Sequence, residues 1–128
     1  MATSYFETRP LPREADATAP DGSDVRILLS LDGGSMAHFS LAPGRTSRAV
    51  RHRTVEEIWY IIDGQGEMWR AEAAREEVTA LSAGISVSIP VGTRFQFRAT
   101  GDVPLQAVAI TMPPWPGEDE AEFVEGPW

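Results

Sequence analysis

From residue 25 to residue 112, short apolar stretches alternate with turns that contain glycine or proline. Residues 32–34, 64–66 and 90–92 are such turns, because glycine and proline favour the tight reversals that join neighbouring strands. No stretch of ten residues has the apolar spacing of a helix; residues 70–77 come closest, and they lie where a hairpin loop is expected. Eight or nine short strands at this spacing predict an all-β fold, either a sandwich or an antiparallel barrel. The predicted strands are residues 25–31, 35–42, 47–53, 57–63, 67–71, 77–81, 85–89, 93–99 and 105–112.

Two segments without this pattern flank the strand-rich region. Residues 1–24 contain three prolines and little periodicity, so we expect an extended N-terminal arm. Residues 25–112 form the predicted β-barrel domain. Residues 113–128 read PPWPGEDEAEFVEGPW and are expected to be a proline-rich acidic tail, since its three leading prolines prevent regular strand pairing.

The composition excludes several classes of function. The net charge is -8 and all 11 basic residues are arginine, so the chain lacks the basic face that nucleic acids require. Without lysine and cysteine, it has no Schiff-base, thiolate or disulfide chemistry. The start of the chain lacks a secretory signal, and no apolar run approaches the roughly 20 residues of a membrane span. We therefore expect a cytoplasmic protein with neither nucleic acid nor membrane as partner.

Two blocks of the sequence, residues 44–64 and 84–100, share a glycine-led arrangement of strand and turn. The positions that carry it are Gly44, Glu57 and Gly64 in the first block, and Gly84, Pro90 and Gly92 in the second. This framework resembles the two motifs of the cupin family, in which six residues separate the glutamate from its glycine and the second motif begins Gly-x5-Pro-x-Gly. The resemblance covers residues 25–112 and implies a cupin-type double-stranded β-helix, a jelly-roll-like antiparallel barrel.

The resemblance ends at the metal ligands. In cupins, two histidines, a glutamate and a third histidine hold a divalent metal. Here Arg51 and Arg53 take the first two histidine positions and Phe95 takes the third, so only Glu57 remains. With the alternative spacing of the motif, His52 becomes the second histidine and the first is still missing. The standard four-ligand site is absent, and no metal cofactor is expected on that pattern.

Strand alternation leaves two orientations open for residues 47–53, because a shift of one residue reverses every side chain. If Arg51 and Arg53 point inward, the pocket suits an anionic ligand, since guanidinium groups bind carboxylates and phosphates. If His52 points inward, it shares a site with Glu57 and the arginines are solvated. Glu57 has a structural interpretation as well, as an ion-pair partner of Arg51 or Arg53.

The candidate site follows from these residues. Glu57 is the expected catalytic acid–base group, because burial in an apolar pocket raises a carboxyl pKa toward neutrality. His52 is a second acid–base group. The expected ligand-binding residues are Arg51, Arg53, Trp59, Phe95 and Phe97. The leading hypothesis is a cupin barrel that binds a small, partly apolar, anionic molecule, with metal-independent isomerase, lyase or cyclase chemistry.

Two alternatives remain open. His38, His52 and Glu57 are the minimum set for an atypical iron, manganese, nickel or zinc site, which predicts dioxygenase or lyase chemistry. Both histidines can equally be ordinary strand residues. The other alternative is a non-catalytic small-molecule binding module. Because cupins of this kind exchange N-terminal strands, the resemblance also implies a homodimer.

Overall fold

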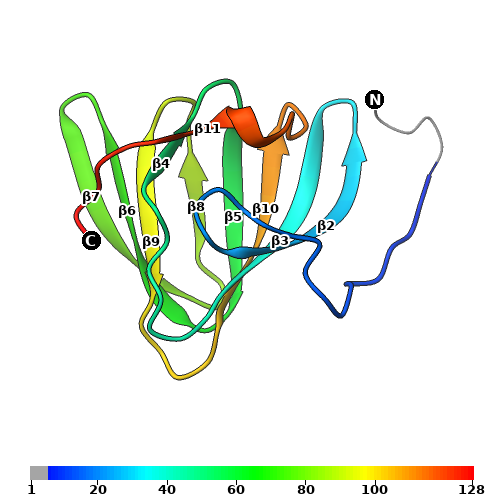
Figure 1. Ribbon diagram of the computed structural model, residues 1–128, viewed down its shortest axis with the longest axis horizontal. Coiled ribbons are helices and arrows are strands. Elements are labelled where there is room, and N and C mark those ends of the chain that lie inside the picture. Colours follow the sequence, from blue (N-terminus) through cyan, green and yellow to red (C-terminus); the bar gives the residue numbers. More distant parts are fainter. Residues whose placement is uncertain (1–5) are drawn as a thin grey trace.

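The computed structural model describes residues 6–128, which form two sheets of antiparallel strands (Figure 1). The larger sheet contains, in spatial order, β1 (Ala17–Thr18), β2 (Asp24–Leu31), β3 (Gly34–Leu41), β10 (Leu105–Met112), β5 (Glu56–Asp63) and β8 (Ser86–Ile89). The smaller sheet contains β11 (Ala121–Phe123), β4 (Val50–His52), β9 (Arg94–Ala99), β6 (Gln65–Glu72) and β7 (Arg75–Ser82). One turn of 3₁₀ helix, η1 (Glu118–Glu120), precedes β11.

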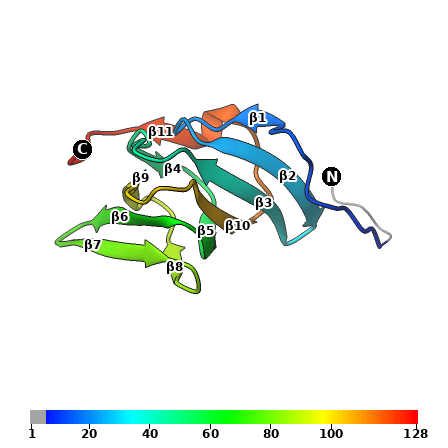
Figure 2. The same cartoon turned by 90° about the horizontal axis from the view of Figure 1, so that it is seen from below.

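From β3 to β11 the chain passes repeatedly between the sheets: β3, β5, β8 and β10 lie in the larger one, and β4, β9 and β11 in the smaller. The β6–β7 hairpin is the one place in this stretch where successive strands stay in the same sheet, and it projects at one end of the molecule (Figure 2). This crossing pattern winds the two sheets around a shared interior. The predicted all-β double-stranded β-helix is confirmed.

Alternate side chains fill the space between the sheets, as the period of two along a strand requires. On β5, Glu57, Trp59 and Ile61 are buried, whereas Ile58 and Tyr60 are exposed. The hydrophobic core between the sheets consists of Leu41, Val50, Trp59, Ile61, Met68, Leu81, Val87, Ile89, Phe95, Phe97, Ala99, Leu105, Ala107 and Ala109. Each large side chain in it contributes about 1.5–3 kcal/mol by leaving water.

The predicted strands are present, with boundaries shifted by a few residues. The main change is that the strand expected over residues 47–53 is reduced to Val50–His52. Residues 70–77 form the hairpin of β6 and β7, in which Glu72 pairs with Arg75 and Ala73 adopts a φ of 42° in the turn.

The expectation that the C-terminal tail avoids strand pairing is wrong for its second half. The three leading prolines lie before Gly117, and β11 follows them. Ala121 pairs with His52 and Phe123 with Val50, so β11 covers the free edge of β4 (Figure 1). The prolines therefore prevent strand pairing only in the first part of the tail.

Glu120 fixes the tail to the loop after β4. Its carboxylate accepts hydrogen bonds from the backbone N–H groups of Thr54 (2.7 Å) and Val55 (2.9 Å) and from the Thr54 hydroxyl. Its backbone carbonyl accepts the N–H of Arg53 at 3.1 Å. This glutamate side chain is almost completely buried.

The N-terminal arm follows an extended path and adds β1 to the edge of β2. Residues 1–5 of the predicted arm lie outside the described residues. Phe6 and Leu11 are exposed, so neither packs into the barrel. Within residues 6–128, no helix is long and apolar enough to cross a membrane.

Candidate functional site

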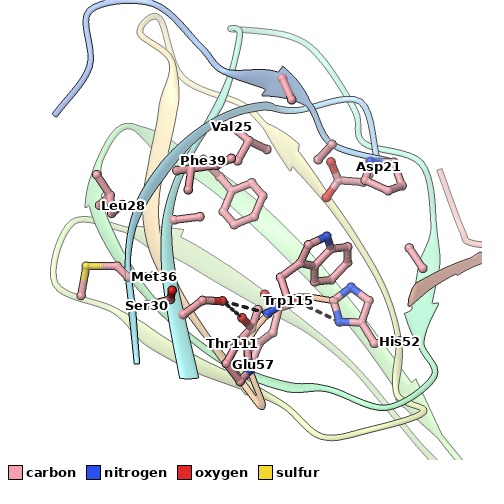
Figure 3. Close-up of a pocket in the computed structure, with 18 of the residues that line it drawn as sticks. Asp21, Val25, Leu28, Ser30, Met36, Phe39, His52, Glu57, Thr111 and Trp115 are labelled. Atoms are coloured by element: carbon pink, nitrogen blue, oxygen red, sulfur yellow. Dashed lines mark hydrogen bonds and ion pairs between the residues drawn. The ribbon is translucent and has the colours of Figure 1, made fainter. Parts of the chain in front are cut away.

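A cavity of about 600 Å³ lies between the sheets, and several residues of β2 line it. Its walls come from strands of both sheets, from the turn before β2 and from the chain after β10 (Figure 3). One part is apolar and includes Val25, Leu28 and Phe39. The polar part contains His52 and Glu57. A cavity of this size, with few polar groups among apolar walls, is typical of small-molecule sites.

The orientation of β4 decides which predicted residues reach this cavity. Val50 and His52 are buried and line it, whereas Arg51 is exposed on the opposite side. The Arg51 guanidinium lies 2.8 Å from the Glu122 carboxylate, and Arg53 lies 3.5 Å from the same group. Arg51 and Arg53 therefore do not line the cavity, and the alternative in which they point inward is wrong. Solvated arginines paired on the surface avoid the desolvation cost that an interior position carries.

His52 and Glu57 form the polar centre of the cavity wall. Nδ1 of His52 lies 2.7 Å from Oε2 of Glu57, and both side chains are at least nine-tenths buried. The indole N–H of Trp59 donates to Oε1 of Glu57 at 2.8 Å. Glu57 therefore pairs with His52, and the structural interpretation as a partner of Arg51 or Arg53 is wrong. The dashed line from His52 in Figure 3 marks this contact.

The His52 ring is held on several sides. Phe95 meets it edge-on with centroids 5.3 Å apart, and Trp115 meets it edge-on at 5.1 Å. Among residues 6–128, Nδ1 makes no well-aligned hydrogen bond, although it lies 2.7 Å from Oε2 of Glu57. Nε2 also has no hydrogen bond to any described residue, but, unlike Nδ1, it is not completely enclosed by protein atoms. It is the ring nitrogen that a ligand in the cavity can reach.

Aromatic side chains form much of the remaining wall. Trp59 and Phe95 line the cavity, as predicted, and Phe39 stacks on Trp59 with centroids 5.3 Å apart and planes 5° from parallel. Phe97 packs behind Trp59 at 5.0 Å and belongs to the core, outside the cavity lining. Phe97 was predicted to bind the ligand, but it does not reach the cavity, because neighbouring inward positions on β9 differ in depth along the barrel.

The atypical metal set does not come together. His38 lies on the outer face of β3, where Nε2 is 2.9 Å from the side-chain oxygen of Gln106, and it does not line the cavity. Burial is the main cause that lowers the His38 pKa. Within the described part of the chain, no three histidine or acidic side chains are grouped as metal ligands. His38, His52 and Glu57 therefore do not fit a shared metal ion, because strand alternation puts His38 and the pair on different faces.

Asp21 and Trp115 are among the cavity residues that were not predicted from the sequence. Asp21 comes from the turn before β2, and Trp115 from the tail, where its backbone N–H donates to the Ser35 hydroxyl at 3.0 Å. Asp21 stands in the stretch PDGS, which indicates a turn and gives no sign of its position in the barrel. Burial raises the pKa of Asp21, the hydrogen bonds from Ser23 oppose this, and the negative charge of Glu57 adds to the increase.

Comparison with known proteins matches the chain to the family described as "Cupin domain" over residues 37–111. An uncharacterized protein of Methanocaldococcus jannaschii, MJ1618, is 32% identical over 104 residues, which cover 77% of this chain and 80% of that protein. The xanthan biosynthesis protein XanB of Xanthomonas campestris is 28% identical over 71% of this chain, but the match spans only 19% of XanB.

Solved structures share the fold at lower identity. An uncharacterized protein from Klebsiella pneumoniae with a double-stranded β-helix domain aligns with a TM-score of 0.67 and 19% identity, covering 97% of this chain and 99% of that one. The Streptomyces nucleoside dehydratase Pac13 aligns with a TM-score of 0.70 and 15% identity, covering 92% of each chain. The family match, the relative from Methanocaldococcus and the crossing of the strands agree: this chain belongs to the cupin family.

Proposed function

We propose that this cupin binds a small, partly apolar, uncharged molecule in its cavity and moves a proton on it, with His52 as the acid–base group. The observation that supports this is the buried contact between His52 Nδ1 and Glu57, which leaves Nε2 toward the cavity. A carboxylate beside one ring nitrogen orients the imidazole and stabilises its protonated form while the other nitrogen exchanges the proton.

This assignment reverses the roles expected from the sequence. Both carboxylate oxygens of Glu57 already have partners, His52 and the Trp59 indole, so Glu57 is better suited to positioning than to attacking a substrate proton. His52 takes a proton from a substrate carbon through Nε2. The electron pair of the broken C–H bond forms a new C–C double bond, while either the π pair of an adjacent carbonyl moves to its oxygen or the bond to a neighbouring leaving group breaks with its electron pair. Return of the proton at another atom gives isomerisation, and departure of a neighbouring group gives elimination.

The charge of the cavity favours an uncharged ligand over the anionic one predicted from the sequence. The charged or titratable residues that line it in the described structure are Asp21, Asp32, His52 and Glu57, with no arginine among them. A carboxylate ligand entering this cavity meets the buried carboxylate of Glu57 and has no guanidinium to pair with. Because the arginines lie outside the cavity, we expect an uncharged substrate in place of the anionic one.

The test is hydrogen exchange in D₂O, followed by ¹H NMR, with 2-indanone and 2-tetralone as uncharged, partly apolar ketones. We expect the protein to speed loss of their α-proton signals, and His52→Gln to lower the rate at least about a hundredfold, which is the contribution typical of a general base. The matched control is His38→Gln, since His38 is the other histidine of the chain and lies outside the cavity.

Glu57→Gln separates positioning from a merely structural role. In Glu57→Gln we expect the exchange rate to fall less than in His52→Gln. We also expect the balance of the two His52 tautomers to change, which the ¹⁵N chemical shifts of the ring report. Equal exchange rates in the wild type and His52→Gln would contradict the proposal. Saturable binding of both ketones without any exchange would identify a non-catalytic binding module instead.

A further inference from the structure

We propose that Asp21 is the acid of this site, and that its Oδ2 donates a hydrogen bond to a carbonyl or hydroxyl oxygen of an uncharged ligand. The inference rests on the proposed function of His52 and names the substrate class of the same cavity. It assigns a ligand contact to the segment before β2, which lies outside both cupin motifs.

The backbone around Asp21 aims its side chain into the barrel. The N–H of Ala19 donates to the Ser23 carbonyl at 2.8 Å, and the N–H of Gly22 donates to the Ala19 carbonyl at 2.9 Å. Gly22 has a φ of 96°, a conformation that glycine adopts without strain. On the other side, the Asp21 carbonyl accepts the N–H of Arg48 at 2.7 Å. The turn is thus fixed within itself and to the chain preceding β4.

The carboxyl group itself is satisfied on one oxygen only. Both the backbone N–H and the hydroxyl of Ser23 donate to Oδ1, at 2.9 and 2.6 Å. Oδ2 has no hydrogen bond to any residue in the described structure, yet the Asp21 side chain is buried and lines the cavity (Figure 3). The turn uses only Oδ1 of Asp21, because Oδ1 accepts both hydrogen bonds from Ser23. The free oxygen is therefore the one available to a ligand.

The surroundings of Asp21 favour its neutral form. The charged groups that act on it from the facing strands are Glu57, which opposes ionisation, and His52, which assists it more weakly. Arg48, whose backbone N–H contacts the Asp21 carbonyl, has its guanidinium carbon 3.6 Å from the centroid of the Phe123 ring, so its charged group is engaged elsewhere. Because two donors point at Oδ1, that oxygen is an acceptor, so in the neutral form that we propose the proton resides on Oδ2. The cavity then receives an O–H donor.

A neutral carboxyl opposite an imidazole is a matched acid and base. The Oδ2–H group of Asp21 donates to the substrate oxygen and makes the neighbouring C–H more acidic. Nε2 of His52 accepts the proton, the C–H electron pair forms the C–C double bond, and the carbonyl π pair moves to the oxygen that Asp21 holds. The step needs no oxidant, reductant or additional reactant.

The test uses three probes that share one apolar body: 2-naphthol, 2-naphthoate and 2-naphthylmethylamine. Binding is measured by isothermal titration calorimetry and located by the indole N–H signals of Trp59 and Trp115. Asp21→Asn keeps an acceptor for Ser23 and places an amide N–H where Oδ2 stood. Asp21→Ala removes the donor, and Ser23→Ala is the matched control, because it removes one of the same hydrogen bonds while keeping the carboxyl.

We expect 2-naphthol to bind the wild type and Asp21→Asn within about threefold of each other, and Asp21→Ala about tenfold more weakly, the loss of one hydrogen bond. Ser23→Ala should bind close to wild type, and 2-naphthoate should bind most weakly. The inference is overturned if the amine binds best and Asp21→Asn loses it, since Asp21 then acts as a carboxylate. It is also overturned if 2-naphthol binds Asp21→Ala as tightly as the wild type, or if 2-naphthoate binds most tightly.

The two proposals fail in different ways. Probe binding that ignores Asp21, together with exchange that depends on His52, leaves the proposed function intact and removes only the role of Asp21. If none of the probes shifts the Trp59 or Trp115 signals, the role of Asp21 is overturned, whereas the exchange of the two ketones still decides the role of His52.

Discussion

Asp21 and Glu120 are two buried carboxyl groups in the segments that flank the barrel, and they differ in how completely they are paired. Glu120 receives three hydrogen bonds from the loop after β4, spread over both oxygens. Asp21 receives two, both on one oxygen and both from Ser23. Burial raises the pKa of Glu120, but the hydrogen bonds from Thr54 and Val55 outweigh it, and the net pKa lies below its ordinary value. For Asp21 burial prevails, and its pKa is raised.

The difference distinguishes a structural acid from a candidate functional one. A buried carboxylate whose acceptors are all used stabilises the fold and has nothing left to offer a ligand. A buried carboxyl with one oxygen free toward a cavity is costly as an ion and useful as a donor. The predictions below test that distinction, beginning with the largest effect.

Replacing Glu120 should destabilise the fold most. Glu120→Ala leaves the N–H groups of Thr54 and Val55 without their acceptor inside the protein, and we expect a loss of about 3 kcal/mol in the free energy of unfolding. Urea unfolding followed by tryptophan fluorescence measures it. The control is Glu122→Ala, which removes the exposed partner of Arg51 and should cost less than about 1 kcal/mol. Similar losses of unfolding free energy in both variants would mean that Glu120 does not fix the tail to the loop after β4.

The pH dependence of stability should have opposite signs at the two carboxyls. With a raised pKa, Asp21 stabilises the fold below its unfolded pKa of about 3.9, and this stability is lost as pH rises through its folded pKa. Asn cannot ionise, so Asp21→Asn should gain stability relative to the wild type as pH rises from 4 to 8. With a lowered pKa, Glu120 stabilises the fold above its unfolded pKa of about 4.3, and this stability is lost as pH falls through the folded value.

Glu120→Gln should therefore differ from the wild type mainly above about pH 4.3, and the deficit should shrink in acid. Unfolding curves for both variants at a series of pH values give the comparison. Parallel pH profiles for wild type and Asp21→Asn would count against a raised Asp21 pKa.

Most of the fold followed from the sequence because glycine and proline mark the turns locally, and turn positions fix strand lengths. The short strand β11 did not, since its pairing depends on the free edge of β4, which is distant in the chain. The orientation of His52 could not be decided, because both faces of residues 47–53 carry polar side chains and nothing local favours one register. The expected homodimer and cytoplasmic location stay predictions, and light scattering tests the first.

Asp21 was missed for a related reason. Its signal, proline followed by aspartate and glycine, is that of an ordinary turn, and its place in the cavity arises only when Arg48 and the strands beyond it fold around that turn. Trp115 lies after two prolines in a segment that the sequence marks as a tail. The spacing of the motifs cannot predict site residues that come from flanking segments, because the motifs lie within the barrel.

The most direct test of this account is a ¹³C NMR titration of the side-chain carboxyl carbons of Asp21 and Glu120 in the same sample. The account predicts that Asp21 titrates above the ordinary range for aspartate and moves toward it in Glu57→Gln, while Glu120 titrates below the ordinary range for glutamate. An Asp21 pKa at or below the ordinary value, unchanged in Glu57→Gln, would contradict the claim that this cavity holds a neutral acid opposite His52.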